Sequence, residues 1–307
     1  MVGSVLLRGL VTGLLALAIS CGGAAGGAGP ATGTSEAALN TDNGLTTNGL
    51  TTNGLTTNGL TTNGLTTNGL TTLAFASWFT LNPWTAPLLM RYLVRCGLPK
   101  DKSLSYTSGL TTYVWYGELG FAPTWGSGSS IPVAEQQMMS ACLAAHTNKY
   151  GVQMMVSIRG YYTSGRYIPV SSAELTDYPN DEGCYFGNLF DGTGVFSAFS
   201  SSSPMASWDK SSQRACAVNG GIPGSCAPML ATGKTCQQVC SGDGSDISKY
   251  FEYRSCTWNG VSYLPLSVRI RNADIATCGD GICQASERCY SPTTGDGCAS
   301  DCGVCGN

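Results

Sequence analysis

The chain has 307 residues, of which 11% are charged, and its formal net charge is −3. Typical soluble domains carry about 25% charged residues, so hydroxyl and amide groups must supply much of this surface. The 16 lysines and arginines are scattered singly, which excludes the basic patch that nucleic-acid binding requires.

The first segment has the features of an export signal. A single cation, Arg8, precedes the apolar run 10–18, which is too short to span a bilayer as a stable anchor. The sequence Ala18-Ile19-Ser20-Cys21 follows, and small residues before a lone cysteine resemble the lipobox of bacterial lipoproteins. The alternative is an ordinary signal peptide that is cut elsewhere.

The lipobox resemblance implies that residues 1–20 are a signal peptide and that Cys21 carries diacylglycerol on its sulfur. The membrane is then a partner through the lipid anchor, because several acyl chains hold a protein stably. Gly22, in place of Asp, resembles lipoproteins that are released to the outer membrane. We therefore expect an exported protein at the outer membrane or cell surface.

Two low-complexity segments follow. Residues 21–42 are rich in Gly, Ala, Ser and Thr, which predicts a flexible tether. In residues 43–72 the pentapeptide Asn-Gly-Leu-Thr-Thr recurs unchanged six times. Asn-Gly favours turns and Thr-Thr favours extended backbone, so the repeat could coil as a short solenoid, similar to pentapeptide-repeat proteins, or stay disordered. Six copies make only about one and a half coils, which favours a poorly ordered spacer.

Residues 73–276 are expected to form an α+β body with a mostly antiparallel sheet and two main helices. The first helix covers 83–96, with Gly97 as its cap. The second runs from Ser130 or Pro132 to 150, and its Met and Leu residues at helical spacing predict a core face.

Strands are predicted where aromatic and β-branched residues cluster. Tyr253 to Trp258 and Val261 to Ile270 flank Asn259-Gly260, which predicts a hairpin with a two-residue turn. Between 200 and 248, Gly, Ser, Pro and Cys predominate, which predicts long loops stapled by disulfides. The other predicted strands cover residues 113–116, 152–158, 167–170, 184–190 and 195–199, and the strand before the turn could begin at 250.

If Cys21 is lipidated, 14 of the 15 cysteines remain, and an even number is expected of a disulfide-bonded protein in an oxidising compartment. Helix ends place Cys96 near Cys142, and we expect local pairs among the cysteines of 216–256. Zinc is the alternative for Cys298, Cys302 and Cys305 because of their spacing. The predicted disulfide cysteines are Cys96, Cys142, Cys184, Cys216, Cys226, Cys236, Cys240, Cys256, Cys278, Cys283, Cys289, Cys298, Cys302 and Cys305.

The tail, 277–307, has its own pattern of Cys-Gly-Asp-Gly from Cys278, Glu-x-Cys from Glu287, and Gly-Asp-Gly-Cys ending at Cys298. This pattern resembles the cysteine-rich disulfide repeat of surface proteins in myxobacteria, and the layout of the body is similar to uncharacterised exported proteins. The resemblance implies a small extracellular module without catalytic activity.

No cofactor is expected, and calcium in the tail is the alternative that uses oxygen ligands. Oxygen ligands on turning backbone suit hard cations, although Asp-Gly is also common in plain solvent-facing turns, and no EF-hand spacing is present. The calcium candidates are Asp280, Glu287, Asp296 and Asp301.

Catalytic residues are not predicted. His146 is the only histidine and is expected to cap the second helix or to lie on the surface. Nothing singles out two carboxylates for a hydrolase, and tryptophans in a body of this size are more often core than sugar platforms. The carboxylates considered were Glu118, Glu135, Glu174, Asp177, Asp181, Glu182, Asp191 and Glu252, and the tryptophans were Trp78, Trp84, Trp115, Trp125, Trp208 and Trp258.

The sequence therefore favours a non-catalytic surface lipoprotein that serves adhesion, envelope structure or ligand capture, with a glycan or protein partner. One alternative is an exported, carboxylate-dependent hydrolase of polysaccharide or peptide. The other is a carbohydrate-binding module that uses exposed aromatic residues.

Overall fold

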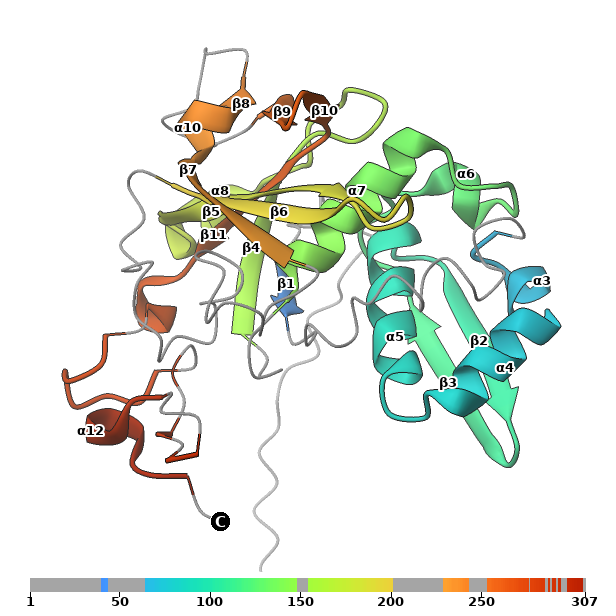
Figure 1. Cartoon of the computed structure of the whole chain (residues 1–307), viewed down its shortest axis with the longest axis horizontal. Helices are drawn as coiled ribbons and strands as arrows, with labels where there is room; N and C mark the ends of the chain where they lie inside the picture. Colours follow the sequence, from blue (N-terminus) through green and yellow to red (C-terminus); the bar gives the residue numbers. More distant parts are fainter. Residues whose placement is uncertain are drawn as a thin grey trace, which may run out of the picture. The chain divides into compact units, whose positions relative to one another are not determined.

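The computed structural model describes residues 40–43, 64–147, 154–200, 229–242, 253–275, 277–284, 287, 289–290, 292–293 and 297–305 (Figure 1). The predicted signal peptide, the lipidation site Cys21 and most of the tether lie outside these residues, as do Cys216, Cys226, Asp296, Glu252 and Trp208. Across the described parts of the chain, we find no helix with the length and apolar character needed to cross a bilayer.

A six-stranded sheet forms the centre of the body, in the order β1-β4-β11-β5-β6-β7. All neighbours are antiparallel except β6 and β7, which are parallel. The fold class is therefore α+β with a mostly antiparallel sheet, as the sequence predicted. The strands are β1 (Asn40–Asn43), β4 (Met154–Gly160), β5 (Asn180–Asn188), β6 (Gly194–Phe199), β7 (Met229–Thr235) and β11 (Leu266–Ile270).

Alternation along β11 shows which side of the sheet faces the main hydrophobic core. Leu266, Val268 and Ile270 belong to the main hydrophobic core, whereas Ser267 and Arg269 between them lie on the opposite face. Helix α7 (Val133–Ala145) lies against the sheet in Figure 1, and Met138 and Leu143 belong to the same core. One face of the sheet is thus covered by α7. The other face carries buried polar side chains on β4 and β11 and a second hydrophobic cluster that includes Phe186 and Phe196.

Both predicted main helices are present, with shorter bounds. Helix α5 spans Ala86–Gly97, so Gly97 is its last residue and Leu98 is its C-cap. Helix α7 begins after Pro132, and no side chain caps its N-terminus, so the predicted cap Ser130 is wrong. It ends at Ala145, with His146 as C-cap, short of the predicted end at 150.

A separate layer consists of the two-stranded sheet β2 (Ser103–Ser108) and β3 (Thr111–Tyr116) and the helix α4 (Leu73–Leu81). The sequence analysis did not predict α4. Phe79 lies 4.9 Å from Tyr106 and 5.1 Å from Tyr113, measured between ring centroids. These aromatic contacts hold α4 against the hairpin, and Figure 1 shows the helix beside β2 and β3.

The end of the pentapeptide repeat belongs to the body. The short helix α3 (Thr67–Leu70) lies within it, and Leu65 and Leu70 are buried in the main core. Thr72, the last residue of the repeat, caps α4 by accepting a hydrogen bond from the N–H of Phe75. Residues 64–72 are thus packed and in part helical, unlike the solenoid or the disordered spacer that we expected. The leucines account for this packing, because Leu65 lies beside Gly97 of α5 and Trp125 of α6, and α3, which carries Leu70, contacts β2 and α4. Asn43, the first residue of the repeat, and residues 40–42, the end of the predicted flexible tether, belong to strand β1.

The predicted hairpin at Asn259-Gly260 is confirmed. Val261 pairs with Trp258, which leaves two residues in the turn, and both have positive φ, 51° and 79°. The predicted strand after the turn is divided, however, because Pro265 has no N–H to donate. Its first part, β10 (Val261–Tyr263), joins a three-stranded sheet with β9 (Ser255–Trp258) and β8 (Cys240–Ser241), whereas β11 joins the central sheet.

Other predicted elements also differ. Residues 167–170 form only an isolated bridge, between Tyr161 and Tyr167, and Pro169 prevents a longer ladder. The predicted loop 200–248 contains β7, the short helix α10 (Cys236–Val239) and β8. The remaining short helices are α6 (Pro123–Gly126), α8 (Ser172–Asp177), the 3-10 turn η2 (Asn272–Asp274) and α12 (Ala299–Cys302).

Candidate functional site

Every cysteine among the described residues is in a disulfide. The expected pair Cys96–Cys142 is present and links α5 to α7. Cys184 bonds to Cys236, so the expectation of purely local pairs in 216–256 is wrong for Cys236. The other bridges are Cys240–Cys256, Cys278–Cys298, Cys283–Cys302 and Cys289–Cys305. The three cysteines with zinc-like spacing are all bridged, so none of them offers a thiolate to zinc.

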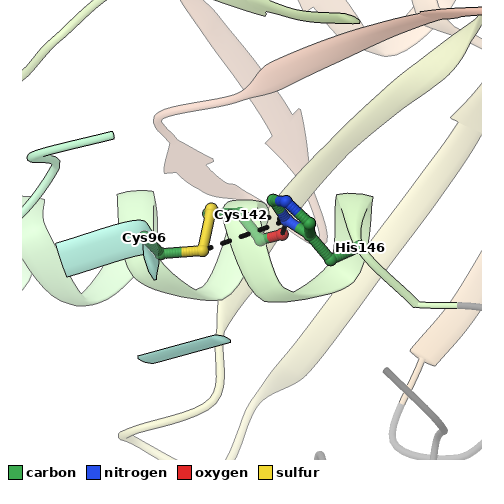
Figure 2. Close-up of side chains that lie close together, drawn as sticks. All are labelled: Cys96, Cys142 and His146. Carbon is green, nitrogen blue, oxygen red and sulfur yellow. Dashed lines mark hydrogen bonds between the residues drawn. A yellow bond between two sulfur atoms is a disulfide. The ribbon is translucent and has the colours of Figure 1, made fainter. Parts of the chain in front are cut away.

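The only histidine lies beside the Cys96–Cys142 bridge, in the interior (Figure 2). Nδ1 of His146 is 2.8 Å from the backbone oxygen of Cys142 and 3.6 Å from its Sγ. A carbonyl oxygen only accepts, so Nδ1 carries the hydrogen and donates it. The capping role is therefore confirmed, and the alternative surface position is wrong because His146 is fully buried. The arrangement stabilises the end of α7.

The described candidate carboxylates of the hydrolase alternative are held by neighbouring groups. Glu135 accepts hydrogen bonds from the N–H groups of Thr124 and Trp125 at 2.8 and 3.0 Å, which caps α6. Glu118 pairs with Arg95 at 2.9 Å. Asp191 accepts from Thr193, Asp181 pairs with Arg269 at 3.0 Å, and Glu182 accepts from the hydroxyl of Tyr185. These contacts give the five carboxylates named here a structural role.

The most buried charges lie on the polar face of the central sheet. Arg159 of β4 is fully buried, and its Nη2 lies 3.8 Å from Oε1 of Glu174 in α8, which is also buried. The hydroxyl of Ser157 donates to the same Glu174 oxygen. Burial also raises the pKa of Tyr253, and the nearby Asp181 raises it further, so this phenol stays neutral. The cluster ties α8 and β4 together.

The tail carboxylates hold their own loop. Asp301 accepts hydrogen bonds from the N–H groups of Gly279 at 2.6 Å and of Asp280 and Gly281 at 3.2 Å each. Desolvation would raise the pKa of Asp301, but these N–H groups outweigh it, and the pKa is lowered. Glu287 is buried and not in a solvent-facing turn, and desolvation raises its pKa. Calcium binding by these groups stays a prediction.

A pocket of about 410 Å³ lies where the repeat meets the body. Leu65 to Thr67 form one wall, and the end of α5, the start of β2 and α6 form the others. Its size suits a small ligand. Lys102 is the one charged residue among the lining residues, and no carboxylate lines it, so the pocket offers no acid–base pair.

Helix α4, the turn that follows it and the tip of the β2–β3 hairpin expose large apolar side chains, which we call the α4 face: Leu73 (87% exposed), Leu81 (79%), Trp84 (90%) and Leu110 (106%). Sequence analysis treated Trp84 as a core residue and overlooked the three leucines. Two other tryptophans, Trp115 and Trp125, are indeed buried. The signal that could have revealed the α4 face is the absence of any charged residue between residues 43 and 90.

Comparison with known proteins gives one match. A family model described as GLTT repeat matches residues 44–72, with six copies. Neither the curated proteins nor the solved structures contain a match to this chain. The chain is therefore similar to the GLTT repeat family across its repeat, and the disulfides fit a cysteine-rich protein with a repeat segment.

Proposed function

We propose that the chain is an exported lipoprotein that is anchored through acylated Cys21 and serves the cell envelope as a non-catalytic surface or ligand-binding protein. The body would be displayed at the outer membrane or cell surface. Its disulfide bridges would keep the body folded outside the cytoplasm.

The observation that carries the proposal is that all twelve described cysteines are in six disulfides. Disulfides persist in oxidising compartments and are rare in the cytosol of mesophiles, where reductants keep thiols free. Both cysteines of the Cys96–Cys142 and Cys184–Cys236 bridges are fully buried, and the sequence separations that the six bridges close run from 16 to 52 residues. Such bridges stabilise by restricting the unfolded chain, which suits a protein that must survive without repair.

The non-catalytic part of the proposal is supported by the contacts of the candidate groups. His146 donates to the last turn of its own helix, and its ring lies against Tyr92 at 5.3 Å. Glu135 and Glu174 accept hydrogen bonds that fix local structure. A general acid or base must instead reach a substrate from an accessible position.

The intact mass of protein extracted from its native membrane tests the proposal. We expect a mass that corresponds to cleavage before Cys21 plus a diacylglycerol and further acyl chains. Reduction should add two hydrogens for each bridge. A chain that keeps residues 1–20, or that carries no acyl group, would contradict the lipoprotein assignment.

A second candidate function is carbohydrate binding, which Trp84 favours because its indole is 90% exposed and could stack on a sugar ring. A glycan array with the full chain and with Trp84→Ala tests it. Specific binding that the variant loses would support this function. Equal signals from both proteins would exclude Trp84 as the platform.

A further inference from the structure

Helix α4 presents an apolar side to solvent as well as to the core. Phe75 and Phe79 face the hairpin and are buried, whereas Leu73 and Leu81, two turns apart, are exposed on the opposite side. A surface helix of a soluble domain usually carries charged residues on that side. Here the outer side consists of Leu, Ala, Ser and Thr only.

The elements next to α4 also carry exposed apolar side chains. Trp84 follows α4 in the turn before α5, and Leu110 lies at the tip of the β2–β3 hairpin. Residues 43–90 and 103–117 contain no Asp, Glu, Lys or Arg. Binding at this surface would therefore require no desolvation of a charge, which is the largest cost of entering an apolar environment.

The backbone that carries the exposed side chains is held by aromatic packing between α4 and the hairpin. Phe75 lies 4.8 Å from Tyr106, and Tyr113 stacks on Trp115 at 5.9 Å. The indole N–H of Trp115 donates to the backbone oxygen of Pro87 at 3.1 Å, which fixes the hairpin to the start of α5. Since α4 and the hairpin share this aromatic core, the α4 face is held in place before any ligand arrives.

We propose that the α4 face rests on the surface of a lipid bilayer, with Trp84 at the headgroup level and the leucines against the acyl chains. An indole combines an apolar body with one donor and is enriched at membrane interfaces. The three exposed leucines favour lipid over sugar, because aliphatic side chains offer no ring to stack on a sugar. The uncharged face, on a chain of net charge −3, selects neutral over anionic headgroups.

The proposed anchor would bring this face to a membrane, and to that extent the inference depends on the proposed function. Eighteen residues separate Cys21 from Asn40, the first residue of β1, which pairs with β4 of the central sheet. That length spans at most about 65 Å even when fully extended. An acylated Cys21 would thus keep the body close to the bilayer, where a weak interfacial contact suffices.

The test uses the full mature chain with Cys21→Ser, so that no acyl group contributes, mixed with phosphatidylcholine vesicles. We expect co-flotation with the vesicles and a blue shift of tryptophan emission that Trp84→Phe diminishes. Trp84→Ser and Leu81→Ser should each lower partitioning about tenfold. Phosphatidylglycerol should weaken binding, and added salt should restore it.

Val133→Ser and Ile282→Ser are matched controls, because each removes a 62% exposed apolar side chain elsewhere in the chain. Both should bind vesicles as the parent does, and equal thermal midpoints should show that all variants are folded. Unchanged flotation of Trp84→Ser and Leu81→Ser would overturn the proposal. So would a dimer in sedimentation that Leu81→Ser dissociates, or glycan binding in place of vesicle binding. Since the tested chain carries Cys21→Ser, these outcomes do not depend on whether the native chain is acylated.

Discussion

The Cys96–Cys142 bridge should be the main covalent contribution to the stability of the packing between α5 and α7. It closes a separation of 46 residues that includes the β2–β3 hairpin and α6, and both cysteines are fully buried. Replacing both by alanine restores loop entropy to the unfolded chain. For a loop of this length the expected loss is about 4 kcal/mol of unfolding free energy. The double replacement is required, because a single one leaves a thiol that can exchange with other bridges.

Guanidinium unfolding followed by tryptophan fluorescence measures this loss. The midpoint should fall, and the thermal midpoint should drop by about 8–16 °C. Val133→Ser serves as a surface control and should change neither midpoint appreciably. A loss below about 1 kcal/mol for Cys96→Ala/Cys142→Ala would refute the reasoning, because it would mean that the bridge does not restrict the unfolded ensemble.

Three further predictions concern packing, buried charge and pH. Leu65→Ala should cost about 2–5 kcal/mol because Leu65 is fully buried, whereas Leu73→Ala, at an 87% exposed position, should cost little; urea unfolding compares them. Arg159→Met should cost about 3–5 kcal/mol by leaving Glu174 buried without its ion pair, and Arg159→Met/Glu174→Leu should cost less; a smaller loss in the single variant would contradict this. Desolvation raises the pKa of Asp301, but the N–H groups of residues 279–281 lower it overall. The ionised Asp301 should therefore stabilise this loop above its ordinary pKa of 3.8, and the loop should open as the pH falls through the lower pKa of the folded state. Amide hydrogen exchange should show this opening, and Asp301→Asn should abolish its pH dependence.

Local signals allowed several features to be predicted from sequence. Asn259-Gly260 specifies its turn through the positive φ of both residues, whatever the rest of the chain does. The presence of α5 and α7 followed from apolar periodicity, although their bounds differ from the predicted ones, and the expected pairing of Cys96 with Cys142 is present. In each case a few neighbouring residues determine the outcome.

Other features depend on packing that the sequence does not reveal. The copies of the repeat are identical, so nothing local distinguishes Leu65 and Leu70, which pack in the core, from the leucines of earlier copies. Helix α4 is apolar on both sides, so it lacks the periodicity by which surface helices are recognised. The parallel pairing of β6 with β7 and the Cys184–Cys236 bridge join segments far apart in the chain. Such long-range partners follow only from the three-dimensional fold.

Disulfide mapping of the native, unreduced protein tests the central claim most directly. Free thiols are first blocked by alkylation, the chain is digested without reductant, and the linked peptides are identified by mass spectrometry. The account predicts peptides that join Cys96 to Cys142, Cys184 to Cys236 and Cys240 to Cys256, together with the three bridges of the tail. Recovery of these cysteines in alkylated, unlinked peptides would contradict it, because the chain would then have matured in a reducing compartment.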